Sequence, residues 1–259
     1  MNIIKHVVLL FFLFSSIACK RDKDTVTIRL EVEDVLINNI LEVWYPRILD
    51  TVNGGFFSNF DADWNRMPEQ DKFIVTQARG IWSASQAAGL FPEDSRYIKS
   101  ADHGFSYLRD SMWDRQYGGF HSVHPISTES DLSRYKLAYG NAFAIYALAA
   151  YYRISENPDA LRLAKKTFHW LEENSYDSIY GGYYNVLFRE GRSILTPGFE
   201  IPSNDYMKNN AVYKDYNSSI HLLEAFTELY QVWNDSLLEN RLREMLSIVR
   251  DTMISLYGY

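Results

Sequence analysis

One turn motif recurs three times along the chain at an almost constant spacing. Each copy has the pattern Asp-x-x-x-Gly-Gly-aromatic-x, and the copies begin at Asp50, Asp114 and Asp177. These aspartates are 64 and 63 residues apart (114 − 50 and 177 − 114). A single Gly-Gly pair is weak evidence, but three pairs in step with their aspartates are typical of a repeat protein. The spacing therefore predicts one structural unit per period.

The segments on either side of each turn predict two helices of different character. The helix before the turn has charged residues on one side, as a solvent-facing layer should. The helix after it is almost free of charge: none lies between Lys136 and Arg153, and Arg79 is the only one between Lys72 and Glu93. We expect outer helices at about 28–49, 95–113, 158–173 and 236–254. We expect inner helices at about 73–89, 135–153 and 215–233.

Outer and inner helices that alternate, with one hairpin per repeat, predict an all-α closed toroid of the (α/α)6 type. An inner ring that is hydrophobic on nearly every face needs neighbours on both sides. Six hairpins at this period would need roughly 380 residues, whereas the chain has 259. We therefore expect about three and a half hairpins of an incomplete toroid, which a truncated reading frame would explain.

The connections after the Gly-Gly turns are long, and the last spans roughly residues 175–213. Its sequence between 183 and 195 indicates a short hairpin. Long loops on one face of a rigid scaffold usually build or cover a site. The loops therefore place a candidate site on the face of the toroid where these turns lie.

Composition restricts the partners. The net charge of −7 argues against nucleic acid, because nucleic-acid binding calls for basic patches. The chain is rich in aromatic residues, with 19 Tyr, 15 Phe and 6 Trp. Flat rings suit carbohydrate recognition, although aromatic residues fill cores more often than sites.

The first residues are typical of an export signal. Lys5 precedes the apolar run 7–14, which is too short to span a membrane, and Cys19 follows Ser-Ile-Ala as in a bacterial lipobox. We expect residues 1–18 to be a signal peptide, Cys19 to be lipidated and residues 19–27 to form the lipidated terminus and tether. The folded domain would then span 28–259 of an exported lipoprotein, membrane-anchored on the periplasmic or cell-surface side. The alternative is an ordinary signal peptide that is cut nearby.

The predicted inner helix at 215–233 carries a single polar stripe. On a helix that advances about 100° per residue, Asn217, His221, Glu224 and Glu228 lie in one wedge roughly 60° wide. Apolar side chains cover most of the remaining surface. The stripe therefore faces either a lumen that binds a polar ligand or a core in which hydrogen bonds hold the histidine.

From about Val35 onward the chain resembles the N-acylglucosamine 2-epimerase and cellobiose 2-epimerase superfamily. The segment from Asn217 to Phe226 is close to the Asn-x-x-x-His-x-x-Glu-Ala motif of cellobiose 2-epimerases. The resemblance implies an (α/α)6 barrel and epimerase activity without a cofactor. The other segments that carry it are the Asp-x-x-x-Gly-Gly turns, Gln77-Ala-Arg79-Gly-Ile-Trp82 and Tyr139-Gly-Asn141-Ala-Phe143-Ala-Ile-Tyr146-Ala-Leu.

The resemblance also implies roles for individual residues. Inverting carbon 2 of an aldose requires opening the ring, removing the proton beside the carbonyl and returning it to the other face, through an enediolate. Arg79 would supply the cation that stabilises the oxyanion. In the alternative interpretation, Arg79 is a structural residue that forms a buried ion pair with Glu224 or another carboxylate. His221 would assist ring opening or hold the intermediate. The implied substrate-binding residues are Tyr139, Asn217, Trp82 and Glu224, of which Trp82 is alternatively a core residue.

The other histidines of the chain do not supply the acid and base of the family's reaction. The two histidines that act as acid and base in the family lie in its C-terminal half, and no residue here corresponds to them. His103 and His169 lie on predicted outer helices, where we expect a solvated surface position. His121 and His124 form a His-x-x-His pair without an evident third ligand, so we expect no metal site.

Three functions stay open at this stage. The first is a 2-epimerase that acts on the reducing-end sugar of cellobiose or mannobiose, or on N-acylglucosamine. The second is another (α/α)6 carbohydrate enzyme such as a glycoside hydrolase, which would need two carboxylates across the site, whereas the inner helices offer Glu224 and little else. The third is an inactive sugar-binding lipoprotein.

Overall fold

The computed structural model describes residues 25–45, 47–125, 131–194 and 214–253. The chain divides into two compact units, the second of which begins at Ile48. In the first unit, residues 25–34 form a helix that continues through the π-helical segment η1 (Val35–Leu41) into α2 (Glu42–Trp44). The predicted helix 28–49 is therefore confirmed as far as Trp44.

The predicted signal peptide and Cys19 lie outside the described residues, whereas residues 25–27, predicted as the end of the tether, are helical. Among the helices that the structure describes, none is both long enough and apolar enough to span a membrane.

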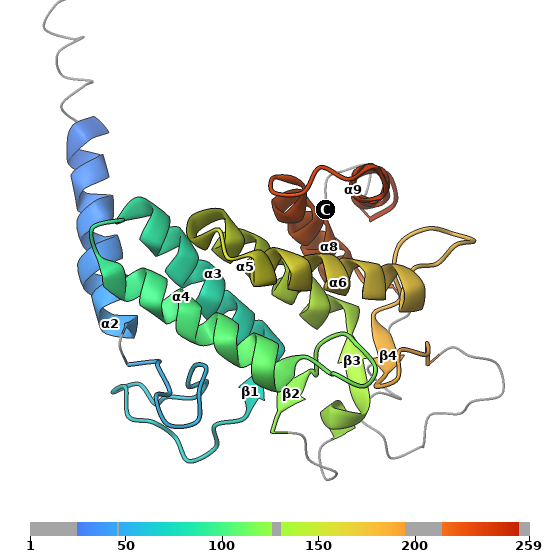
Figure 1. Cartoon of the computed structure of the whole chain (residues 1–259). Helices are drawn as coiled ribbons and strands as arrows, with labels where there is room; N and C mark the ends of the chain where they lie inside the picture. The colour runs from blue at the N-terminus through green and yellow to red at the C-terminus, as the bar shows by residue number, and fades with distance from the viewer. Residues whose placement is uncertain (1–24, 46, 126–130, 195–213, 254–259) are drawn as a thin grey trace, which may run out of the picture. The chain divides into compact units, whose positions relative to one another are not determined.

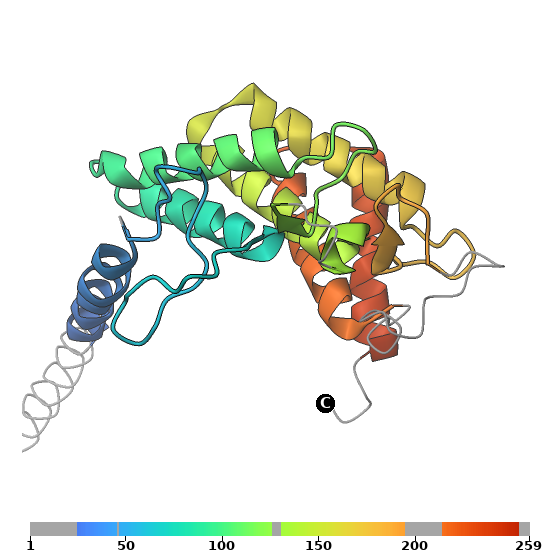
Figure 2. The same ribbon diagram turned by 90° about the horizontal axis from the view of Figure 1, so that it is seen from below.

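Three helical hairpins lie side by side in chain order in the second unit (Figures 1 and 2). The inner helix α5 packs between the other two inner helices, and each inner helix packs against the outer helix that follows it. This arrangement confirms the predicted order of layers. The inner helices are α3 (Ile74–Leu90), α5 (Ala138–Ser155) and α8 (Tyr216–Tyr230). The outer helices are α4 (Ser95–Tyr107), α6 (Pro158–Asn174) and α9 (Ser236–Ile248), of which α4 and α9 continue as the π-helical turns η2 (Leu108–Met112) and η4 (Val249–Met253).

Small side chains let α5 occupy the middle of the inner layer. Six of its alanines have no exposed surface, and no charged residue lies between Ala138 and Tyr152. An alanine adds little bulk to a helix, so the backbones of α3 and α8 can approach α5 from both sides. The fully buried alanines are Ala138, Ala142, Ala144, Ala147, Ala149 and Ala150.

Two small sheets join the loops of neighbouring repeats. Strand β1 (Lys72–Phe73) pairs antiparallel with β2 (Val123–His124), and β3 (Tyr135–Leu137) pairs antiparallel with β4 (Val186–Phe188). The predicted helix 135–153 therefore begins three residues late, at Ala138, and a short 3-10 turn, η3 (Asp131–Arg134), precedes β3. The hairpin predicted in the last loop is present in its described part, where the chain leaves β4 and returns.

An ion pair closes each Gly-Gly turn. The aspartate that opens the motif pairs with a lysine two residues before the next inner helix, and the same lysine donates to the carbonyl of the first glycine. Both glycines of every turn have φ between +68° and +80°, where a Cβ atom would be strained. The pairs, with their Nζ–Oδ2 distances, are Asp50–Lys72 at 2.7 Å, Asp114–Lys136 at 3.0 Å and Asp177–Lys214 at 2.5 Å.

The outer-helix histidines differ in their surroundings. Nε2 of His103 lies 2.8 Å from the carbonyl oxygen of Gly55 in the first turn, and its ring meets the edge of Phe56. The prediction of a solvated surface position for His103 is therefore wrong, because the second glycine of the turn reaches α4. His169 is exposed, as predicted.

Candidate functional site

Side chains from all three inner helices meet in one cluster, which we call the inner cluster: Arg79, Tyr139, Phe143, His221 and Glu224. The guanidinium carbon of Arg79 lies 4.9 Å from the centroid of the Phe143 ring. The Phe143 ring lies 4.5 Å from the His221 imidazole, which is 5.2 Å from the ring of Tyr139. These contacts connect α3 to α8 through α5.

Arg79 contributes an exposed cation to the inner cluster. Its side chain is exposed, and within the described residues it makes neither an ion pair nor a hydrogen bond. The contact with the Phe143 ring uses no hydrogen bond, so the guanidinium N–H groups are available to a ligand. The alternative of a buried ion pair between Arg79 and Glu224 is therefore wrong.

Glu224 instead holds His221. Nδ1 of His221 lies 2.7 Å from Oε2 of Glu224, one helical turn later on α8. A carboxylate only accepts hydrogen bonds, so Nδ1 carries the proton and Nε2 of a neutral His221 is left as the basic nitrogen. The N-cap fixes where α8 begins, because the Asp215 side chain accepts a hydrogen bond from the backbone N–H of Ser218 at 2.7 Å.

The other predicted site residues lie around this cluster. Asn217 is exposed in the first turn of α8, one turn before His221. Trp82 follows Arg79 on α3 and stacks on Tyr146 of α5, with ring centroids 5.2 Å apart and planes 15° from parallel. The structure thus brings Arg79, Tyr139, His221 and Glu224 together, and it places Trp82 in a separate stacking pair.

Two further groups on the inner helices were not selected from the sequence. Phe143 lies four residues after Tyr139, on the same face of α5, and this spacing could have identified it. Glu228, the last member of the polar stripe, pairs with Arg153 of α5 at 2.7 Å rather than with His221. The two carboxylates of the polar stripe therefore have different partners: Glu224 contacts His221 and Glu228 contacts Arg153.

His121 and His124, the two histidines after the second Gly-Gly turn, each contact a neighbouring side chain. Nε2 of His121 lies 3.6 Å from Oδ2 of Asp114, and Nδ1 of His124 lies 2.7 Å from the hydroxyl of Tyr107. Burial lowers the pKa of His121 to about 4, although the charge of Asp114 opposes this shift. In the described ranges, no group of three or more His, Cys, Asp or Glu side chains is arranged to hold a metal ion.

The chain is similar to proteins of one known family. The model of the N-acylglucosamine 2-epimerase (GlcNAc 2-epimerase) family matches residues 55–258. The cellobiose 2-epimerase of Bacteroides fragilis is 30% identical over 232 residues, which cover 88% of this chain and 56% of that protein.

Solved structures of cellobiose 2-epimerases are also similar to this chain. The cellobiose 2-epimerase of Spirochaeta thermophila superposes with a TM-score of 0.74 at 30% identity, over 87% of this chain and 54% of that one. The enzyme of Bacillus thermoamylovorans superposes with a TM-score of 0.75 at 27% identity, over 89% and 57%. The chain therefore spans little more than half the length of these relatives.

The hairpins and these structural neighbours define the chain as part of an (α/α)6 toroid of the carbohydrate-epimerase type, which confirms the predicted fold class. The chain belongs to the N-acylglucosamine 2-epimerase family.

Proposed function

We propose that the chain acts on a sugar as a carbohydrate 2-epimerase. The reaction interconverts the gluco and manno configurations at carbon 2 of a reducing-end sugar, such as that of cellobiose or mannobiose, or of N-acylglucosamine. The observation that carries this proposal is the inner cluster, in which a cation and an oriented imidazole from different helices contact the same ring, that of Phe143. The names of the relatives support a disaccharide substrate.

Each side chain has a chemical task in this proposal. Loss of the carbon 2 proton places negative charge on the two oxygens of the enediolate. Arg79, whose N–H groups have no partner among the described residues, stabilises that charge. Nε2 of His221 accepts the hydroxyl proton at carbon 1 as the bond between carbon 1 and the ring oxygen breaks, and returns this proton to the ring oxygen, while Glu224 keeps Nδ1 protonated. Tyr139, Asn217 and Trp82 orient the sugar.

Sugar binding without turnover is the second candidate function. Epimerisation must return a proton to the face opposite the one from which it left, which calls for a second acid–base group. Among the described histidines, His221 is the only one on an inner helix. A glycoside hydrolase is not proposed, because the candidate carboxylates Glu224 and Glu228 are engaged by His221 and Arg153.

We further propose that the protein is exported and anchored through lipid on Cys19, so that it meets its sugar outside the cytoplasm. The basic residue Lys5, the apolar run 7–14 and the Ser-Ile-Ala-Cys sequence support this proposal. Substitution of Cys19 by Ala should move the protein from the membrane fraction to the soluble fraction and remove the incorporation of labelled fatty acid. Unchanged fractionation and labelling would contradict lipidation.

Deuterium exchange separates the two sugar-related functions. The purified chain is incubated with cellobiose or mannobiose in heavy water, and deuterium at carbon 2 is measured by NMR. Exchange that is lost in Arg79→Ala and kept in Lys99→Ala, a substitution of an exposed lysine on α4, supports the epimerase. Binding of either disaccharide without exchange supports the binding protein. Failure to bind any of the proposed sugars, N-acylglucosamine included, contradicts both.

A further inference from the structure

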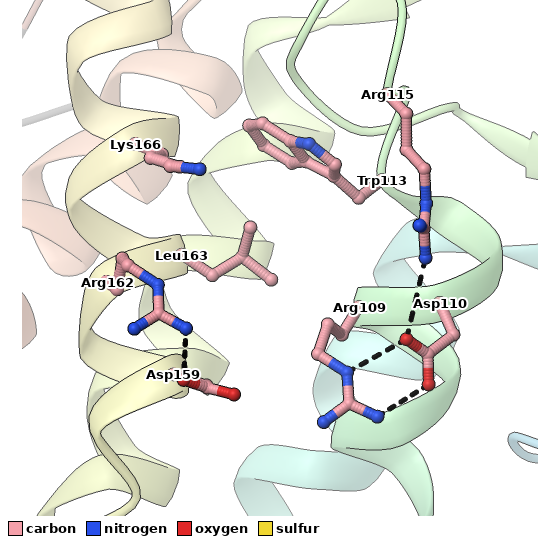
Figure 3. Close-up of a pocket in the computed structure, with 8 residues that line it drawn as sticks. All are labelled: Arg109, Asp110, Trp113, Arg115, Asp159, Arg162, Leu163 and Lys166. Carbon is pink, nitrogen blue, oxygen red and sulfur yellow. Dashed lines mark hydrogen bonds and ion pairs between the residues drawn. The ribbon is translucent and has the colours of Figure 1, made fainter.

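A pocket of about 260 Å³ lies in the outer layer, between α6 and the end of the α4–η2 helix with the turn that follows it. We call it the outer pocket. Figure 3 shows its lining side chains converging from these two sides. None of them belongs to the inner cluster, which lies on α3, α5 and α8, so the outer pocket is a separate feature of the fold.

The outer pocket is positively charged, although the chain as a whole carries a net charge of −7. Four basic and two acidic side chains line it, which leaves a surplus of two positive charges. A basic surface within an acidic protein concentrates anionic ligands. The basic residues are Arg109, Arg115, Arg162 and Lys166, and the acidic residues are Asp110 and Asp159.

The contacts locate this surplus. Asp110 accepts two hydrogen bonds from Arg109, at 2.9 and 2.6 Å, and its Oδ1 also lies 3.7 Å from the Arg115 guanidinium. One carboxylate thus serves two arginines. Arg162 has its own partner in Asp159, whereas Lys166 makes no ion pair in the part of the chain that the structure describes. The excess positive charge therefore lies on Arg115 and Lys166, which line opposite walls of the outer pocket.

The remaining lining is apolar. The indole of Trp113 extends into the space between the two walls, and Leu163 and Lys166 point toward it from α6 (Figure 3). The edge contact with Phe120, at 5.2 Å between ring centroids, supports the indole. Trp113 is half-buried and Leu163 is 7% exposed. The part of this apolar wall that faces the pocket accommodates the C–H face of a sugar ring, while the cations bind an acidic substituent.

We propose that the outer pocket binds an acidic sugar, a hexose unit that carries a phosphate, sulfate or carboxylate group. Its volume of about 260 Å³ is below the ~300–1,000 Å³ of pockets for drug-sized ligands, so a single monosaccharide unit fits. The acidic group pairs with Arg115 and Lys166, and the ring lies on Trp113 and Leu163. This site is independent of the inner cluster and of the epimerase proposal.

Calorimetric titration of the full chain tests the proposal, with glucose 6-phosphate and glucuronate as probes and glucose and inorganic phosphate as references. At least one acidic sugar should bind, and glucose should bind at least tenfold more weakly than that sugar. The double variant Arg115→Glu/Lys166→Glu should weaken the binding at least tenfold. The matched control Lys99→Glu reverses an exposed charge on α4 outside the outer pocket and should change the affinity less than twofold.

Any of five outcomes would overturn the proposal. The first is that neither acidic sugar binds, and the second is that inorganic phosphate binds as tightly as the sugar phosphate. The third is that Lys99→Glu weakens binding as much as the double variant, which would show a general charge effect. The fourth is that phosphatidylglycerol vesicles bind in a way that depends on Arg115 and Lys166 while the soluble sugars do not. Saturating cellobiose, a neutral sugar, should leave the titration unchanged, and displacement by cellobiose would also count against a separate site.

Discussion

Nδ1 of His221 lies 2.7 Å from Oε2 of Glu224 on the same inner helix. This contact selects the tautomer in which Nδ1 carries the proton. We expect the long-range 15N–1H spectrum of wild-type protein above neutral pH to show the Nδ1–H form of His221. Glu224→Ala should shift His221 toward the Nε2–H form, because the acceptor for Nδ1–H is lost. Glu228→Ala, which removes a carboxylate that pairs with Arg153 instead, should leave the tautomer unchanged.

Glu224→Ala should also reduce the epimerase activity or the sugar affinity of the protein. Loss of a hydrogen bond to a charged group costs about 1.5–3 kcal/mol, which corresponds to roughly a tenfold or larger loss of carbon 2 exchange, or of sugar affinity if no exchange occurs. Glu224→Gln keeps an acceptor and should fall between wild type and Glu224→Ala. Equal behaviour of all three proteins would contradict the positioning of His221 by Glu224.

Arg79 should affect the reaction far more than the fold. Its side chain is exposed and contacts the ring of Phe143, and such an exposed cation–π contact contributes only about 0.5–1 kcal/mol. Loss of a preorganised donor to a developing oxyanion costs about 10²–10³ in rate. Arg79→Ala should therefore reduce carbon 2 exchange by that order, with less than about 1 kcal/mol change in the free energy of unfolding. A large loss of stability would indicate a structural role instead.

The parts of the fold that repeat were predictable, and the parts that depend on long-range contacts were not. Three copies of the Gly-Gly motif define the hairpins, but the lysines that close the turns follow their aspartates by 22, 22 and 37 residues. No constant spacing identifies the third lysine. Likewise, Tyr135–Leu137 directly precedes α5, and its strand depends on pairing with β4, a segment about 50 residues later in the chain that no local pattern identifies.

The candidate site was predictable to a similar extent. The polar stripe on α8 comes from helical periodicity alone, and it correctly places His221 beside Glu224. Periodicity within one helix does not reveal the partner on a neighbouring helix. The contacts of Arg79 with Phe143 and of Glu228 with Arg153 therefore required the structure.

The ion pair of the second turn should contribute strongly to stability. Lys136 has no exposed surface, and Asp114 is only 2% exposed. Burial alone would raise the pKa of Asp114, but hydrogen bonds from Arg189 and Lys136 lower it well below the usual value. Lys136→Met leaves a buried carboxylate with fewer partners, and removing one partner of a buried pair costs about 3–5 kcal/mol. Arg243→Met, which breaks an exposed pair with Glu239, should cost no more than about 1 kcal/mol in the same denaturant titration.

The first turn should make the protein sensitive to acid. Burial opposes ionisation of Asp50, but hydrogen bonds from Asn53 and Lys72 lower its pKa from 3.8 to about 2. The folded state therefore binds this proton less readily than the unfolded state, so the stabilisation is complete above the unfolded value and is lost as the pH falls toward 2. We expect the free energy of unfolding to decrease between about pH 4 and pH 2. Asp50→Asn should be less stable than wild type at pH 6, and the difference should shrink across this window. A constant difference from pH 6 to pH 2 would contradict the assignment to Asp50.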